Sequence, residues 1–119
     1  MNNPTDIRDI VRRVTEAYVR NDASEVPLDE NVVHRGPMIP APLRGAAAVR
    51  RHMTEIAPFV ARMELKRLVT EGESAAVIFE YEGVNGVVID GAEFFLIRDG
   101  LICEQQVFFD TGPLLRGRS

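Results

Sequence analysis

A carboxylate stands within one of the most apolar stretches of the chain, Gly91-Ala92-Glu93-Phe94-Phe95-Leu96-Ile97. An ionised Glu that leaves water without a partner costs much free energy, and its usual escape is a shifted pKa or a paired charge. The Glu93 side chain therefore either faces solvent or belongs to a site. We expect it to face a pocket, because its strand is the most apolar of the chain and should be central in the sheet.

Four other ionisable residues could share this site: Glu80 and Glu82 on a neighbouring strand, and His34 and Arg35 on a short one. An Arg keeps its proton, so in a pocket it needs a carboxylate of the protein or of a ligand. With one Arg and up to three acids, at least one carboxyl would be pushed toward its neutral form. Such an acid can donate a hydrogen bond to a developing oxyanion or act as a general acid, while an ionised partner serves as base. The simpler alternative is a buried salt bridge between Arg35 and Glu93 that braces the fold.

The other candidate groups are weaker. His34 titrates near neutrality, but strand alternation turns it away from the side of Arg35, unless a bulge beside the following proline-rich loop reverses this. His52 is expected on the flank of a helix, and Cys103 is interpreted as a small core residue because no His stands beside it. Two isolated His residues and no dense acidic cluster predict no metal site. We expect no cofactor.

The elements that must position these residues begin with two helices. Thr5 or Asp6 can cap the first, whose apolar residues recur at helical spacing: Ile7, Ile10, Val11, Val14 and Tyr18. The second is expected from about Ala46 to Ala57, where Pro58 stops it. Between them, Asn31 to Arg35 is predicted to be a short strand, and the segment GPMIPAPLRG a loop that crosses the fold.

Four strands are predicted after the second helix, at roughly 62–70, 74–83, 87–97 and 101–109. The turns between them hold Gly72, the pair Asn85-Gly86 and the pair Asp99-Gly100, and such pairs favour tight hairpins. Consecutive hairpins indicate an antiparallel meander. The chain is therefore predicted to be one α+β domain over residues 1–119, with helices on one face of a curved antiparallel sheet. Residues 111–119 are expected to form a short tail.

Composition limits the partners. The chain has 119 residues and a net charge of −4, and it has no basic block, so we expect no nucleic-acid partner. Its uncharged runs are too short to span a membrane, and its beginning lacks the pattern of a signal peptide. The single Cys103 forms no internal disulfide and fits a reducing compartment. We expect a cytoplasmic protein.

The order and spacing of three segments resemble the nuclear-transport-factor-2-like superfamily, in its SnoaL-like and ketosteroid-isomerase-like branch. These segments are the first helix ending in YVRND, the stretch from LDENVV to PLRGAAAVRRHM, and the close FFLIRDGLICEQQVFFD. The resemblance covers nearly the whole chain. It implies a cone-shaped, cystatin-like roll with an apolar internal pocket between a bent sheet and the helices, and often a homodimer through the outer sheet face. Activity does not follow, since this fold carries many chemistries.

Residue by residue, the resemblance implies few inherited roles. Glu93 falls where ketosteroid isomerases keep an acid that hydrogen-bonds an oxyanion, but Arg35 replaces their proton-abstracting Asp and Val14 their oxyanion-hole Tyr. Against the limonene epoxide hydrolases, Glu80 and Glu82 fall on an Arg and an Asp of the catalytic triad. Val107 replaces the Asp base there. Neither mechanism is therefore complete in this chain.

Strand alternation in the register that the resemblance suggests gives an inner and an outer set. The expected inner set is Ile78, Glu80, Glu82, Gly91, Glu93, Phe95, Cys103, Gln105, Val107 and Phe109. The expected outer set is Val77, Phe79, Tyr81, Phe94, Leu96 and Phe108, which is apolar enough to predict a dimer interface. Alternation also permits the opposite reading of residues 77–82, with Val77, Phe79 and Tyr81 in the core and both Glu side chains in solvent.

The residues expected to bind a substrate are Tyr18, Met38, Ile39, Met53, Phe59, Ile78, Phe95, Gln105, Val107 and Phe109. We expect a cofactor-independent enzyme that isomerises, cyclises, dehydrates or hydrates a polyketide-, terpenoid- or steroid-like compound by proton transfer. Glu93, Glu80, Glu82, Arg35 and His34 are its candidate catalytic residues. The alternative is a non-catalytic module for small-molecule binding or dimerisation, which the loss of the familiar base positions favours.

Overall fold

The structure, a computed structural model, describes residues 6–116 as one sheet with three helices. The helices are α1 (Ile7–Arg20), α2 (Ala46–Ile56), which continues into the 3-10 turn η1 (Ala57–Phe59), and α3 (Gly112–Arg116). The strands are β1 (Leu28–Arg35), β2 (Leu43–Arg44), β3 (Val60–Glu71), β4 (Ser74–Gly83), β5 (Val88–Arg98) and β6 (Leu101–Phe109). Within residues 6–116, none of the helices combines the length and the apolar character needed to cross a bilayer.

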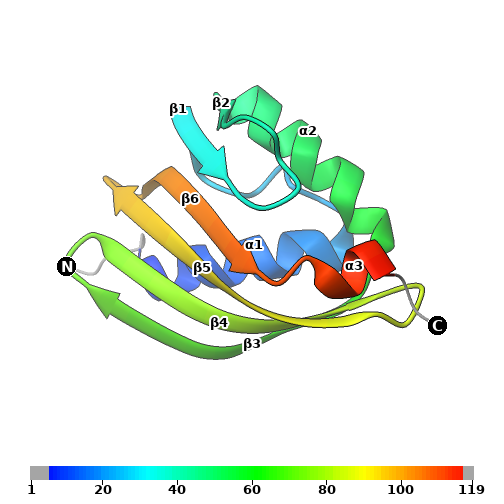
Figure 1. The fold of residues 1–119 in the computed structure, drawn as a ribbon. Helices are drawn as coiled ribbons and strands as arrows, with labels where there is room; N and C mark the ends of the chain where they lie inside the picture. Colours follow the sequence, from blue (N-terminus) through cyan, green and yellow to red (C-terminus); the bar gives the residue numbers. More distant parts are fainter. Residues whose placement is uncertain (1–5, 117–119) are drawn as a thin grey trace.

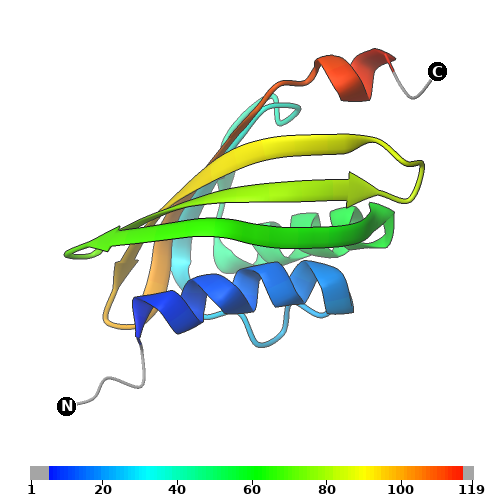
Figure 2. The same ribbon diagram turned by 90° about the horizontal axis from the view of Figure 1, so that it is seen from below.

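The sheet has the order β2-β1-β6-β5-β4-β3. Strands β3 to β6 pair antiparallel in sequence, which confirms the predicted meander. β1 runs parallel to β6, so the sheet is mixed rather than wholly antiparallel. It bends around α1, which lies on its inner side (Figures 1 and 2), and α2 packs against β1. The predicted α+β fold, a curved sheet wrapped on helices, is confirmed.

Local sequence signals account for the ends of the elements. The carboxylate of Asp6 caps α1 by accepting from the backbone N–H of Arg8 at 2.9 Å, while Thr5 lies outside the described residues. Asp99 and Gly100 have φ values of 52° and 77°. Positive φ at both central residues fits the tight turn that joins twisted antiparallel strands. This turn begins the pairing of β5 with β6, and a bulge at Cys103 then shifts the register so that Glu93 lies opposite Val107.

The core lies between α1, α2 and the inner face of the sheet. Its largest fully buried apolar side chains are Phe95, Ile10, Met53 and Ile102. Gly91 on β5 allows the ring of Phe79 to lie against its backbone, because a Cβ at this position would be 2.5 Å from Cζ of Phe79. Phe79 therefore packs directly over the β5 backbone, which identifies the inner face of β4.

Three element boundaries differ from the prediction. β1 begins at Leu28 instead of Asn31, because its first residues pair with β6. The proline-rich loop ends in the two-residue strand β2, which pairs with Val33 and His34. The predicted tail contains helix α3. The first two differences depend on pairing with distant segments, which local periodicity does not reveal.

Candidate functional site

Glu93 lies at the centre of the inner face of the sheet. Its neighbours across the strands are Val77 on β4 and Val107 on β6, both apolar. The residue is only 9% exposed. Burial disfavours the charged form and raises the pKa of Glu93 to about 8. The carboxyl is therefore mostly neutral at pH 7, as a proton donor in an apolar site must be.

Gln105 connects Glu93 to His34 through two hydrogen bonds. Its Nε2 donates to Oε2 of Glu93 at 3.3 Å, and its Oε1 lies 3.2 Å from Nδ1 of His34. Gln105 and His34 are 1% and 2% exposed, and the two residues sit opposite each other on β6 and β1. The three side chains thus form a buried polar row that crosses β5, β6 and β1, which we call the Glu93–Gln105–His34 row.

Two further groups adjoin this row from the helices. The ring of His52 on α2 lies 5.2 Å from the ring of His34, centroid to centroid. Burial lowers the pKa of both imidazoles below the ordinary value, so both favour the neutral form. The pKa of Tyr18 on α1 is raised, first by burial and then by the charge of Glu93. The site is therefore built of groups that are uncharged near neutrality.

The inward orientation of Glu80 and Glu82 is wrong, and the opposite reading of β4 is correct. Val77 and Phe79 are buried, whereas Glu80 and Glu82 project from the outer face. There Arg62 of β3 lies 2.9 Å from the Glu80 carboxylate and 3.2 Å from that of Glu82. The hydrogen bond from Arg62 lowers the pKa of Glu80, which keeps it ionised and removes the basis for a neutral acid at this position.

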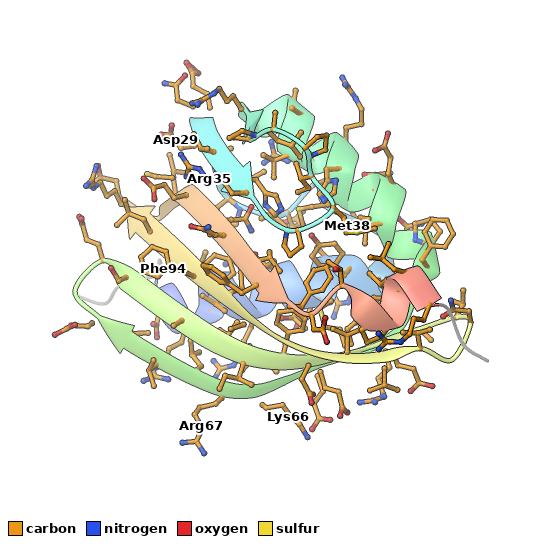
Figure 3. The ribbon with its side chains drawn as sticks, viewed as in Figure 1. Asp29, Arg35, Met38, Lys66, Arg67 and Phe94 are labelled. Atoms are coloured by element: carbon orange, nitrogen blue, oxygen red, sulfur yellow. The ribbon has the colours of Figure 1, made fainter. Side chains whose placement is uncertain are left out.

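Arg35 also lies on the outer face, so its expected inward place beside Glu93 is wrong, although it lines the edge groove described below. It pairs with Gln106, in the same row across the sheet as Phe94. Figure 3 shows Arg35 and Phe94 on the side of the sheet that faces away from α1. Because Glu93 is on the inner face, the proposed salt bridge between Arg35 and Glu93 is also wrong. His34 takes the inner position instead, as alternation on one strand requires once Arg35 is outside.

The expected substrate-binding residues divide into three groups. Tyr18, Met53, Phe95 and Gln105 lie in or against the inner core. Ile39, Val107 and Phe109 are half-buried and line the edge of a groove. Ile78 is 47% exposed on the outer face, which corrects its inward assignment, and Met38 and Phe59 are each 60% exposed. Cys103 is half-buried at a β-bulge of β6 instead of facing inward in the regular register.

A groove of about 390 Å³ runs along the end of β6, where the loop after β1 leaves the sheet. It is lined by Arg35, Gly36, Ile39, Val107 and Phe109, together with prolines of the loop and the neighbouring β6 residues. A second hollow of about 490 Å³ lies on the outer face, around Val69, Ala76 and Phe94. We assign the first to the site because Val107 is the strand neighbour of Glu93. The second lies on the other face of the sheet from the buried acid.

In residues 6–116, no group of three or more His, Cys, Asp or Glu side chains is arranged to hold a metal ion. The available chemistry of the row is therefore that of a neutral carboxylic acid, an amide and a neutral imidazole. A carboxyl with a pKa near 8 can give up and regain a proton near neutral pH.

Sequence reasoning missed Arg62 and assigned His52 no part in the site. The partners of Arg62 stand opposite it on β4, so only the register of β3 against β4 reveals them. One signal did exist for His34. Burial is less costly for an imidazole than for a guanidinium, so of two adjacent residues on a strand, the His is the better candidate for the inside.

A family model described as the SnoaL-like domain matches residues 11–105. The fold is also similar to a nuclear-transport-factor-2-like protein of unknown function from Cytophaga hutchinsonii, with a TM-score of 0.81, 23% identity, and 97% of this chain and 99% of that chain covered. A protein from Kribbella flavida, provisionally described as a ketosteroid isomerase, gives a TM-score of 0.77 at 23% identity over 87% of this chain and 76% of that chain. No curated protein matches the chain.

A de novo designed protein with a curved β-sheet is equally similar, with a TM-score of 0.81 at 18% identity over 97% of this chain and 95% of that chain. The same architecture thus exists in a protein that evolution did not shape. Similarity at this level of identity shows the fold alone, and any function must be argued from the side chains of the site.

Proposed function

The chain belongs to the SnoaL-like domain family, and from the side chains of its site we propose that it is an acid/base enzyme for a small apolar molecule, with Glu93 as the proton donor. The observation that carries this proposal is the buried Glu93 carboxyl, whose pKa is raised to about 8 and which Gln105 orients. A neutral acid in an apolar site stabilises the oxyanion that forms when a carbonyl compound enolises and its α-proton passes to water. The reaction class is therefore isomerisation, cyclisation, dehydration or hydration next to a carbonyl group.

The substrate is proposed to enter by the groove at the end of β6. Its volume of about 390 Å³ falls within the range of small-molecule sites. Ile39 lines the groove, and both Ile39 and Val107 lie close to Gly36. A shift of the Ile39 and Val107 side chains would bring a carbonyl oxygen toward Glu93. Polyketide-, terpenoid- or steroid-like ketones have the apolar bodies that these walls would accept.

Exchange of α-protons tests this function without knowledge of the physiological substrate. Incubated in deuterium oxide with a panel of cyclic and conjugated ketones, the protein is expected to catalyse deuterium uptake beside the carbonyl of at least one, as followed by proton NMR. Glu93→Gln should lower that rate by about a hundredfold to ten-thousandfold, the usual contribution of a positioned acid or base. Glu80→Gln is the matched control on the outer face and should retain the rate. Equal rates in the parent and Glu93→Gln would rule out Glu93 as the acid.

A second candidate function is a non-catalytic binding module. Two observations favour it. The side chains of the Glu93–Gln105–His34 row hydrogen-bond to one another. Both hollows lie at the edge or on the outer face of the sheet. A binding module would hold ketones of the panel, seen as shifted NMR signals of the protein, and exchange none of their protons.

We also propose that a second copy of the chain covers the outer face. The exposed fractions there are 57% for Val69, 47% for Ile78, 36% for Phe94 and 51% for Phe108, and these residues lie in two neighbouring cross-strand rows. A single apolar patch of this kind pairs with itself across a two-fold axis. Phe94→Asp is expected to convert a dimer into a monomer in sedimentation velocity. A parent chain that sediments as a monomer at micromolar concentration would contradict the proposal.

A further inference from the structure

The amide of Gln105 is the only polar link that the described structure shows between Glu93 and His34. One end of the amide contacts Oε2 of Glu93 and the other contacts Nδ1 of His34, at 3.3 Å and 3.2 Å. An amide has one donating end and one accepting end, and rotation by half a turn exchanges them. Because all three residues are buried, water does not freely replace a lost partner. Whenever the amide reverses, the two hydrogen bonds therefore change polarity together.

We propose that Gln105 couples the protonation of Glu93 to the tautomer of His34 by reversing its side-chain amide. When Glu93 is ionised, Nε2 of Gln105 donates to the carboxylate, and Oε1 accepts from a protonated Nδ1 of His34, which leaves Nε2 of His34 as an acceptor. When Glu93 is protonated, its O–H donates to Oε1 of the reversed amide. Nε2 of Gln105 then donates to a bare Nδ1, and Nε2 of His34 carries the hydrogen.

The protons balance in this exchange. Glu93 takes one proton from solvent when it becomes neutral. The imidazole of His34 stays neutral throughout, because it loses a hydrogen at Nδ1 and gains one at Nε2 by exchange with water. Burial supports the uncharged imidazole by lowering the pKa of His34. With the amide unreversed, Nε2 of Gln105 could still donate to the carbonyl oxygen of the neutral acid, but the acid O–H would have no acceptor within the row. The reversed amide supplies that acceptor.

Other titratable groups face this row and must be separated from it. Tyr18 faces Glu93 from α1, and its raised pKa keeps it neutral over the range in which Glu93 titrates. His52 faces His34 from α2, and the charge of Glu55 acts on His52. β4 contributes the apolar Val77 opposite Glu93. His52 is thus the group whose own titration could imitate a change at His34.

The coupling would give the site two matched states. With Glu93 ionised, the site combines a carboxylate with an imidazole that can accept a proton at Nε2. With Glu93 protonated, both groups can donate. Gln105 is in this sense a positioning residue. The inference goes beyond the proposed function, since the coupling can be observed in the protein without substrate and holds whether or not ketones are turned over.

Nitrogen-15 NMR of the imidazoles tests the coupling directly, since long-range proton–nitrogen correlations distinguish the two neutral tautomers. In the parent, His34 is expected to carry its hydrogen on Nε2 below the Glu93 midpoint near 8 and on Nδ1 above it, with the tautomer ratio changing at least about tenfold. His52→Asn assigns the His34 signals and removes the neighbouring titration.

Three variants control the measurement. Glu93→Gln should abolish the pH-dependent change of tautomer, Gln105→Met should abolish it while leaving Glu93 to titrate, and Glu80→Gln should keep it. If Gln105→Met fails to fold, Glu93→Gln alone carries the comparison. A single His34 tautomer throughout the titration of Glu93, or a change that persists in Glu93→Gln, would overturn the proposal. Failure of ketone exchange leaves this outcome unaffected, so the two proposals are tested separately.

Discussion

Replacing Glu93 by Gln is expected to make the protein more stable above neutral pH and to remove most of its alkaline loss of stability. The native state holds the Glu93 proton up to a pKa of about 8, whereas the unfolded chain releases it near the ordinary value of 4.5. Between these two pH values, the folded protein holds the Glu93 proton and the unfolded chain does not, so the folded state binds more protons than the unfolded state. The contribution of this bound proton to the free energy of unfolding is therefore complete below pH 4.5 and is lost as the pH rises through about 8. The loss is on the order of 5 kcal/mol over the whole interval.

Urea unfolding of the parent and of Glu93→Gln, from about pH 5 to about pH 9, measures this difference. Gln has the shape of the neutral acid and no ionisable proton, so the two proteins should have similar stability at the acidic end and diverge steadily toward the alkaline end. The titrations of His52 and of the surface groups are common to both proteins and cancel in the difference. Glu80→Gln should follow the parent. Parallel curves for the parent and Glu93→Gln would show that the acid is not held neutral.

The second large effect is expected at Phe95, which lies two residues after Glu93 on the inner face of β5 and opposite Gln105 on β6. Phe95 is 1% exposed and is among the largest fully buried side chains of the core. Phe95→Ala removes this side chain and leaves a cavity, which should lower the free energy of unfolding by about 3–5 kcal/mol. Small domains have only about 5–15 kcal/mol in total, so a large part of the population should unfold under mild denaturation.

Phe94→Ala is the matched control for this substitution. It changes the same residue type one position away, on the outer face, where Phe94 is 36% exposed. In protein dilute enough to be monomeric, it should cost about 1 kcal/mol or less. Urea midpoints of the two variants compare the faces directly. A larger loss from Phe94→Ala than from Phe95→Ala would mean that the inner and outer faces of β5 are assigned the wrong way round.

Much of the fold could be predicted because its signals are local. The Asp99-Gly100 pair predicts a tight hairpin, and the structure places both residues at positive φ, where Asp and Gly are tolerated better than most residues. The periodicity from Ile7 to Tyr18 predicts α1 for the same reason, since the helical spacing of the apolar residues is visible within the segment itself. The parallel pairing of β1 with β6 has no such local signal and depends on residues far apart in the chain.

In the candidate site, the alternation of apolar and polar residues does not determine which face of a strand points inward. Alternation fixes which residues of β4 share a face, but both faces of β4 carry apolar side chains, such as Phe79 and Ile78. The pattern could not decide between them. The structural reason is Arg62, which pairs with Glu80 and Glu82 on the outside from the neighbouring strand. The inward orientation of Glu93 was predicted from the expected central position of its strand, and β5 does lie inside the sheet, between β6 and β4.

The same holds for β1, which is far in sequence from β6, the strand that it pairs with. Alternation correctly separates His34 from Arg35, yet the face that each takes is set by pairing with Gln105 and Gln106 of β6. That pairing brings the imidazole of His34 to the Gln105 amide and leaves the guanidinium of Arg35 at the groove. The site therefore depends on a long-range contact that the sequence of β1 alone does not specify.

The direct test of the account is the ionisation of the Glu93 carboxyl in the intact protein, followed by the ¹³C chemical shift of its side-chain carboxyl in protein labelled at glutamate. The signal that disappears in Glu93→Gln identifies the residue. We predict a midpoint near 8. A midpoint within the ordinary range of a solvated glutamate, about 4 to 5, would contradict a buried neutral acid and the chemistry built on it.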